Sequence, residues 1–378
     1  MIYLDSAATS FQKPDTVELA MVQALRNMST PGRGDYPSAR AAAETALQCR
    51  TELQELFHAE TPEQVIFTMN ATHALNIAVK SLVPPGGHAV ISGYEHNAVT
   101  RPLFALHAQT AVAKVPLFSD PETVVAAFDR MIGPETDAVI CSHVSNVFGF
   151  VQPVEEIGAL CRAKGVPFLI DASQSAGILP LDFQAAGAAY LAMPGHKGLY
   201  GPQGTGALIC GAEAPNRTLL EGGTGSMSML PDMPDFLPDR LEAGTHNMPG
   251  IAGLLAGVRF VRRRGIPSIC AHERRLAALA AEGLRHIPDI QVYARDDLYA
   301  QTGVVSFLCK KMDTERMGDL LAQAGIAVRS GLHCAPLAHT SAGTEKTGTV
   351  RVSVSVFNTE EEVFQFVEAV DGILSGKS

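Results

Sequence analysis

A single lysine lies between glycines in the stretch Met193-Pro194-Gly195-His196-Lys197-Gly198-Leu199-Tyr200-Gly201-Pro202-Gln203-Gly204-Thr205-Gly206. Its neighbours are small or apolar, and the glycines let backbone or a ligand approach closely. A lysine that is partly removed from water loses its proton more easily, so it can act as an amine nucleophile that forms a Schiff base. Taken alone, the stretch fits an ordinary lysine in a glycine-rich turn better; the other motifs reverse this interpretation.

Strand-like and helical segments alternate around this stretch. Apolar runs typical of strands occur at 65–67, 88–92, 111–115, 138–146, 167–170, 190–192 and 206–210, and helical patterns at 71–82, 121–131 and 154–164. This alternation predicts a parallel sheet with right-handed crossovers, and such sheets bind ligands beyond the carboxyl ends of their strands. Five polar side chains follow strand ends of this kind: His96, Asn146, Asp171, Gln174 and Lys197.

The flanking segments predict a second domain. Helices are expected at 16–26 and 38–58 before the sheet, and 218–245 has little regular pattern. After helices at 251–264 and 269–287, the pattern changes to strands at 290–293, 304–308, 326–328 and 350–354 with helices at 313–324 and 359–374. We therefore expect a large domain over 15–255 and a small α+β domain made of 1–14 and 256–378.

Composition and charge narrow the class of protein. The 378 residues are 46% hydrophobic and 18% charged, which is typical of a globular α/β chain long enough for two cores. A net charge of −10 and the lack of a long basic tract argue against nucleic acid as a partner, so small substrates are expected. With no secretory signal pattern and no apolar run of membrane-spanning length, we expect a cytoplasmic protein without membrane contact.

The seven cysteines include one with an unusual setting. They form no CxxC pair, and their odd number argues against a disulfide framework or a zinc site, so no metal is expected. Cys141, Cys210 and Cys309 end apolar runs and are expected in the core. Cys334 instead lies in a turn-rich segment near Arg329 and His333, and positive charge on these neighbours would favour its thiolate.

The segment Thr68-Met69-Asn70-Ala71-Thr72-His73 joins a predicted strand to a predicted helix. A helix start of this kind presents free backbone N–H groups and the positive end of the helix dipole, which is typical of an anion site. An N-cap by Asn70 or Thr72 that serves only the helix explains the same residues equally well.

These motifs together resemble the fold-type I pyridoxal-phosphate (PLP) enzymes of aminotransferase class V, and most closely the cysteine desulfurase and selenocysteine lyase family. The resemblance spans nearly the whole chain and implies a large domain with a mostly parallel seven-stranded sheet flanked by helices, plus a smaller α+β domain. It rests on the segments 3–9, 70–72, 95–96, 142–146, 171–174, 195–197, 242–245 and 329–334, and on Arg351.

The resemblance implies a set of cofactor contacts. Lys197 would form the Schiff base with PLP and later move the substrate's Cα proton. Asp171 would keep the pyridine nitrogen protonated, Gln174 would bond the phenolic oxygen, and His96 would stack on the ring. The other expected contacts are Asn146 beside the cofactor, Ala71, Thr72 and His196 at the phosphate, and Thr245 at the phosphate of a neighbouring subunit, which implies a homodimer.

The substrate contacts implied by the resemblance centre on Arg351, which would pair with the α-carboxylate together with Asn146 and Arg329. Because Arg351 lies in the alternating run 350–354, an outward-facing charge is the other interpretation. Two residues depart from the family pattern: Pro194 replaces a serine that would touch the phosphate, and His73 replaces a glutamate.

Cys334 decides the expected reaction class, since aminotransferases need no thiol there and desulfurases do. The resemblance implies conversion of L-cysteine to L-alanine with a persulfide formed on Cys334, and the short Arg-x-Gly-x-His-Cys motif resembles the SufS-like subgroup, which passes sulfur to a dedicated acceptor protein. The alternatives are a selenocysteine lyase acting on L-selenocysteine, a class V aminotransferase or epimerase with a structural Cys334, and a sulfur-relay or regulatory protein without catalysis.

Overall fold

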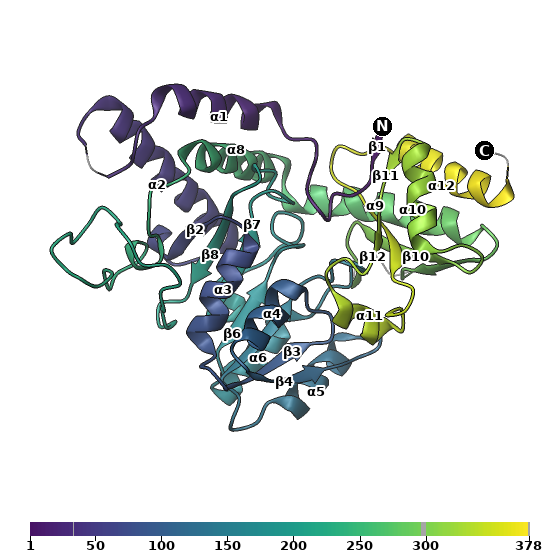
Figure 1. The fold of residues 1–378 in the computed structure, drawn as a ribbon, viewed down its shortest axis with the longest axis horizontal. Helices are drawn as coiled ribbons and strands as arrows, with labels where there is room; N and C mark the ends of the chain where they lie inside the picture. The colour runs from purple at the N-terminus through teal and green to yellow at the C-terminus, as the bar shows by residue number, and fades with distance from the viewer. Residues whose placement is uncertain (33, 296–299, 377–378) are drawn as a thin grey trace.

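The computed structural model describes residues 1–32, 34–295 and 300–376. Two sheets form its centre, a seven-stranded one and a four-stranded one, and helices cover both (Figure 1). Helices α1 (Asp15–Asn27), α2 (Pro37–Phe57) and α8 (Met248–Arg264) pack together along one side of the larger sheet. Among the described residues, no helix has both the length and the hydropathy needed to cross a bilayer.

The seven-stranded sheet confirms the predicted α/β fold. Its strands in spatial order are β2 (Val65–Thr68), β8 (Gly206–Cys210), β7 (Tyr190–Pro194), β6 (Phe168–Asp171), β5 (Ala138–Ser142), β3 (His88–Ser92) and β4 (Gln109–Ala113). The pairings of β8 with β2 and with β7 are antiparallel, and the other pairings of this sheet are parallel, so the sheet is mostly parallel. Strand β4 lies two residues earlier than the predicted 111–115.

Apolar side chains on both faces of this sheet explain why its strands read as continuous hydrophobic runs. Val139 and Cys141 of β5 belong to the core shared with α2 and α8, whereas Ala138 and Ile140 belong to the core on the other face. The helices between its strands are α3 (Ala71–Leu82), α4 (Asn97–Ala105), α5 (Pro121–Met131), α6 (Val154–Lys164) and α7 (Phe183–Ala186). The sequence did not predict α4, whose interior contains Pro102, a residue that usually ends a helix.

The second sheet is antiparallel, with β12 (Arg329–Gly331), β13 (Thr349–Ser353), β10 (Val304–Cys309) and β9 (Ile290–Tyr293) in this order. Helices α9 (Ile266–Arg285), α10 (Thr314–Gln323), α11 (Pro336–Ala342) and α12 (Glu360–Ser375) accompany it. Strand β1 (Ile2–Tyr3) pairs with β11 (Ile326–Ala327) in a separate two-stranded sheet, so the N-terminus lies beside the C-terminal part of the chain. The two-domain division stays a prediction, and its boundary at 255/256 falls within α8.

A buried ion pair fixes the irregular segment 218–245 to the large sheet. Arg50 of α2 pairs with the Glu242 carboxylate, with Nη2 to Oε2 at 2.6 Å, and the Phe67 N–H donates to Glu242 at 2.5 Å. His246 Nε2 lies 2.8 Å from the same carboxylate. Burial would raise the pKa of Glu242, but Arg50 and His246 outweigh it and hold the pKa below its ordinary value.

We expect Glu242→Gln to lower the free energy of unfolding by about 3–5 kcal/mol at neutral pH, because it leaves the buried Arg50 charge without a carboxylate partner. The pKa of Glu242 is lower in the folded chain, so this stabilisation is present above the ordinary carboxyl pKa and is lost as pH falls through the lowered value. Urea denaturation at several pH values measures it. The exposed Asp35, paired with Arg40, supplies the control Asp35→Asn, and equal losses in both variants would contradict the prediction.

Candidate active site

One cavity of about 210 Å³ gathers the predicted site residues. It lies where the carboxyl ends of the parallel strands face the second sheet. The predicted residues that line it are Ala71, Thr72, His96, Asn146, Asp171, Gln174, His196, Lys197, Arg329, Cys334 and Arg351. Thr245 does not line it: this side chain is exposed and borders a separate pocket beside β2.

Neighbouring strand ends bring these side chains together. In the sheet, Asp171 at the end of β6 pairs with Ser142 of β5 on one side and with Ala192 of β7 on the other. Lys197 follows β7 within three residues of its end, and Asn146 follows β5. The carboxyl ends of parallel strands therefore place a carboxylate, an amine and an amide at one edge of the sheet.

The Lys197 side chain is largely buried. Burial, together with the Arg351 charge, lowers the pKa of Lys197 to about 8, although Asp171 and Asp5 oppose this. The pKa of an exposed lysine lies near 10.4. A considerable fraction of Lys197 is consequently neutral near pH 8, as a nucleophilic amine requires.

The N-terminal segment holds the loop that carries Lys197. The His196 carbonyl accepts hydrogen bonds from Ser10 Oγ at 2.9 Å and Lys13 Nζ at 3.0 Å, and the His196 ring lies 2.9 Å from Thr9 Oγ1. Gln174 Nε2 donates to the Ala7 carbonyl at 2.9 Å. These contacts join residues more than 160 positions apart, so local sequence patterns gave no signal for them.

His96 forms the N-cap of α4. Its Nδ1 accepts a hydrogen bond from the Ala98 N–H at 3.0 Å, so the neutral ring carries its proton on Nε2. Burial lowers the pKa of His96, with Asp171 opposing, and this favours the neutral ring. The adjacent Glu95 is fully buried and accepts hydrogen bonds from Ser92 and Ser142, a structural role the sequence did not indicate.

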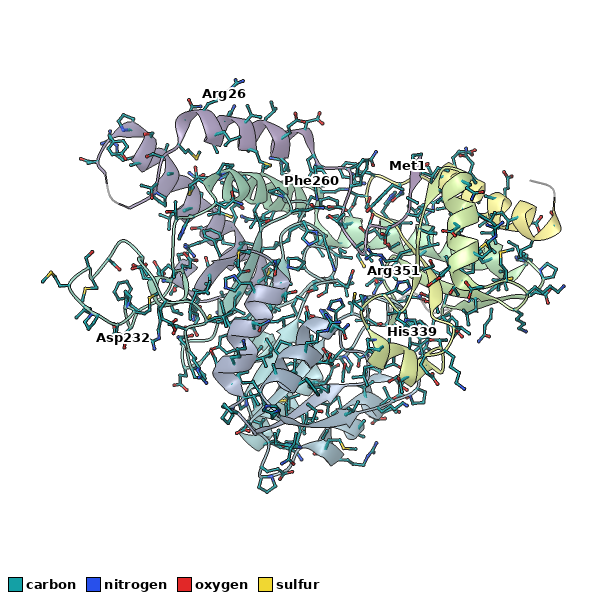
Figure 2. All side chains as sticks on the ribbon, viewed as in Figure 1. Met1, Arg26, Asp232, Phe260, His339 and Arg351 are labelled. Carbon is teal, nitrogen blue, oxygen red and sulfur yellow. The ribbon has the colours of Figure 1, made fainter. Side chains whose placement is uncertain are left out.

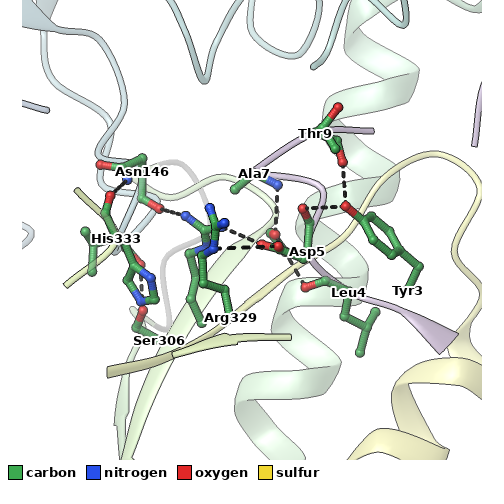
Figure 3. A network of polar contacts seen from close by, with 12 residues as sticks. Tyr3, Leu4, Asp5, Ala7, Thr9, Asn146, Ser306, Arg329 and His333 are labelled. Carbon is green, nitrogen blue, oxygen red and sulfur yellow. Dashed lines mark hydrogen bonds and ion pairs between the residues drawn. The ribbon is translucent and has the colours of Figure 1, made fainter. Parts of the chain in front are cut away.

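Arg351 is only 1% exposed, which excludes the outward-facing interpretation. Its Nη2 donates to Asp5 Oδ1 at 2.6 Å and its Nη1 to the Asn146 carbonyl at 3.0 Å. Its Nε has no hydrogen-bond partner among the described residues. Figure 3 shows Asp5, Asn146, Arg329 and His333 in this polar network, and Figure 2 labels Arg351 near the junction of the two sheets. Arg351 thus lines the cavity with three of its five N–H groups unpaired among the described residues, that of Nε among them.

Cys334 is exposed and the other six cysteines are buried, as predicted for Cys141, Cys210 and Cys309. It lies between β12 and α11, and it follows His333 in left-handed backbone, with φ of 50° and 56° for the two residues. The Cys334 carbonyl accepts from the Asn97 N–H at 2.8 Å, and Asn146 Nδ2 donates to the His333 carbonyl at 2.8 Å. The start of α4 and the Asn146 amide therefore hold the cysteine loop.

The prediction that His333 carries a positive charge is wrong. This ring is buried, and burial together with Arg351 holds the pKa of His333 far below its ordinary value. A neutral His333 does nothing to favour the Cys334 thiolate. Of the two expected cations, Arg329 remains, with an exposed side chain that lines the same cavity as Cys334.

Comparison with known proteins matches residues 2–366 to the family aminotransferase class-V. The chain belongs to the aminotransferase class-V family. It is 33% identical over 388 residues to a probable cysteine desulfurase of Mycolicibacterium paratuberculosis, covering 100% of this chain but 56% of that relative. A probable cysteine desulfurase of Methanothermobacter thermautotrophicus is also 33% identical, with 98% of this chain and 94% of the relative covered.

Solved structures of cysteine desulfurases resemble the chain closely. A cysteine desulfurase from Thermococcus onnurineus superposes with a TM-score of 0.90 at 29% identity, over 99% of this chain and 95% of that one. A cysteine desulfurase from Escherichia coli gives 0.86 at 27% identity, over 99% and 94%. Together with the curated relatives, these matches confirm the resemblance to the cysteine desulfurase family.

Proposed function

We propose that the chain is a PLP-dependent cysteine desulfurase that converts L-cysteine to L-alanine and receives the sulfur on Cys334 as a persulfide. The observation that carries the proposal is a solvent-accessible thiol, Cys334, on the wall of the cavity that also holds the buried amine of Lys197 and the guanidinium of Arg351. Aminotransferase class-V enzymes use PLP, and the curated relatives bear the name cysteine desulfurase.

The residues of the cavity fit PLP. Helix α3 begins at Ala71, so the N–H groups of Ala71 and Thr72 have no intrahelical partner and suit a phosphate group. Asp171 is 2% exposed and suits a protonated pyridine nitrogen, and Lys197 suits the aldehyde carbon. When bound, PLP supplies an electron-accepting ring conjugated to the substrate's Cα. Pro194 also lines the cavity and offers no hydroxyl, so Thr72 and Thr245 carry more of the proposed phosphate binding.

The proposed substrate contacts follow from the unpaired N–H donors of Arg351. A substrate carboxylate gains charge-assisted hydrogen bonds from Nε and from the remaining N–H groups of this guanidinium. Arg329 and the Asn146 side chain border the same space. The substrate is thereby oriented with its α-carbon toward Lys197, whose amine removes and returns the Cα proton.

In the proposed sulfur step, the Cys334 thiolate attacks the substrate sulfur. The new S–S bond forms as the Cβ–S bond of the substrate breaks. The electron pair of the broken Cβ–S bond stays on Cβ, which takes a proton and becomes the methyl group of alanine. Cys334 then carries the persulfide. Because this side chain is exposed, the sulfur can pass to an acceptor protein.

Alanine release and protein-bound persulfide after addition of L-cysteine test the proposal, with Cys334→Ala beside the wild type. We expect stoichiometric persulfide in the wild type and none in the variant. Unchanged sulfide production in Cys334→Ala would remove the proposed role. Conversion of the bound cofactor to its pyridoxamine form by a 2-oxo acid would favour an aminotransferase instead, and faster turnover of L-selenocysteine with little dependence on the thiol would favour a lyase.

Replacing Arg351 with lysine should raise the KM for L-cysteine and lower kcat/KM about 10- to 100-fold, because a point charge cannot reproduce the planar pair of hydrogen bonds. Steady-state kinetics measure the effect. Arg275 is an exposed arginine paired with Glu360, so Arg275→Lys is the matched control and should leave the KM unchanged. A wild-type KM in Arg351→Lys would contradict carboxylate recognition by this residue.

The proposal includes a homodimer in which Thr245 reaches the phosphate bound by the neighbouring subunit. Thr245 is exposed and outside its own chain's cavity, which leaves it accessible to a second copy. Thr245→Val should then weaken PLP binding without loss of fold, which equilibrium dialysis measures. Sedimentation as a monomer with full PLP affinity would contradict the shared site.

A further inference from the structure

A second, much smaller cavity lies against Lys197. Its volume is about 20 Å³, enough for one water molecule. Residues of the N-terminal segment, the lysine loop, α9 and the second sheet form its walls, among them Ser6, Lys197, Glu273 and Thr302. It therefore joins the proposed Schiff-base lysine to groups from the C-terminal part of the chain.

Glu273 is an unusual wall residue. It is 2% exposed, and its one hydrogen bond among the described residues comes from the Tyr200 hydroxyl, 3.5 Å from Oε1. Burial raises the pKa of Glu273 to about 8, although Tyr200 and Arg264 oppose it. The carboxyl is therefore neutral at pH 7, and a neutral carboxyl has an O–H group that needs an acceptor.

Two hydroxyls on the same walls also lack partners. Ser6 Oγ and Thr302 Oγ1 are buried atoms with no hydrogen-bond partner among the described residues. Buried polar groups are almost always hydrogen-bonded, and a buried water typically makes about three such bonds. Ser6, Thr302 and Glu273 supply the partners that one water needs, and the cavity has its size.

We propose that this cavity binds one water molecule and that Glu273 exchanges a proton with Lys197 through it. The neutral Glu273 carboxyl gives its proton to the water, and the water gives one of its own protons to the free amine of Lys197. The products are a carboxylate and an ammonium group, and the reverse transfer restores both neutral groups. The inference rests on the proposed function insofar as Lys197 must gain and lose protons during turnover.

The electrostatic surroundings support the exchange. The pKa of Lys197 and that of Glu273 are both about 8, so a proton moves between them at little cost in free energy. Arg351 and Arg329 lower the pKa of Lys197, whereas Asp171 and Asp5 raise it. His96 and His196 also interact electrostatically with this amine. The titratable groups that interact with Glu273 are Tyr200, Arg264 and Cys270.

Glu273→Gln keeps the shape of the side chain and removes the exchangeable proton. The experiment follows, by absorbance, the rate at which cofactor-free protein captures added PLP over a pH range centred on 8. We expect the variant to capture PLP at least about tenfold more slowly and to lose one of two ionisations near this pH. Thr302→Val, which removes a partner of the water, should slow capture in the same direction. The matched control is Thr314→Val, which removes a buried hydroxyl that donates to the Thr347 carbonyl. It should leave the rate of PLP capture unchanged.

Infrared spectroscopy gives a readout that needs no PLP. Burial also raises the pKa of Glu95 to about 7, so the readout is the difference between the wild-type and Glu273→Gln spectra. This difference should contain a neutral carboxyl band at pH 7 that shifts rapidly in heavy water. Wild-type capture kinetics in Glu273→Gln, or a carboxyl band that is missing or does not exchange, would overturn the proposal. If Glu273→Gln does not fold, the proposal is tested by the PLP capture rate of Thr302→Val and by the shift of the wild-type carboxyl band in heavy water. Failure of the wild type to capture PLP would instead contradict the proposed function.

Discussion

Alanine formation from L-cysteine should fall at least about 10³-fold when Lys197 is replaced with alanine, because the chain loses both its nucleophilic amine and its mover of the Cα proton. The geometry supports so large an effect. Lys197 is buried, its pKa is lowered to about 8, and its loop is held by the N-terminal segment. Borohydride reduction of the PLP-loaded wild type, followed by peptide mapping, should find the cofactor on Lys197.

The control for this experiment is Lys346→Ala, which removes an exposed lysine that does not line the cavity. It should retain wild-type activity and cofactor labelling. Lys197→Ala that keeps more than a tenth of the wild-type rate would contradict the assignment, as would a borohydride label on another residue. A variant that binds PLP without a covalent bond would agree with it, since the Asp171 and α3 contacts are intact.

Cys334→Ser should abolish the protein-bound persulfide and lower alanine formation by about 10²-fold or more. A serine hydroxyl occupies the same place but has a far higher pKa than a thiol, so it is a poor nucleophile toward sulfur. Mass spectrometry of the protein after addition of L-cysteine measures the persulfide, and amino-acid analysis measures alanine.

Alkylation gives an independent test of the same residue. Because Cys334 is exposed and the other six cysteines are buried, a brief treatment with a thiol reagent should modify one site per chain. The modified wild type should behave like Cys334→Ser. Persistent persulfide formation in the serine variant, or full activity after alkylation of Cys334, would show that the thiol is not the sulfur acceptor.

The strands were predictable from sequence because they depend on local patterns, although β4 ends at Ala113 rather than 115 and β5 at Ser142 rather than 146. The apolar runs at β5, β6 and β7 mark strands buried on both faces. Asp171 is the last residue of β6, and Lys197 lies three residues after the end of β7. Helix α4 was not predictable, because Pro102 interrupts its pattern and its stability comes from packing. The position of α4 matters for the site, because His96 is the N-cap residue of this helix.

Contacts between distant segments explain the remaining differences. Asp5 pairs with Arg351 across 346 positions, and nothing in the local sequence of either residue indicates the partner. The sequence predicts a positively charged His333 beside Cys334, but the fold buries the imidazole ring and thereby favours its neutral form. Glu273 lies in an amphipathic helix, and only the packing of α9 against the lysine loop reveals its place near Lys197.

The fate of the substrate sulfur tests the central claim most directly. L-cysteine with an isotopically labelled sulfur atom is added to the PLP-loaded protein, and digestion without reductant locates the label by mass spectrometry. The proposed function predicts one labelled sulfur per chain on the peptide that contains Cys334, formed together with an equal amount of alanine. Alanine formed with all of the label released as free sulfide, or label bound to a different cysteine, would contradict it.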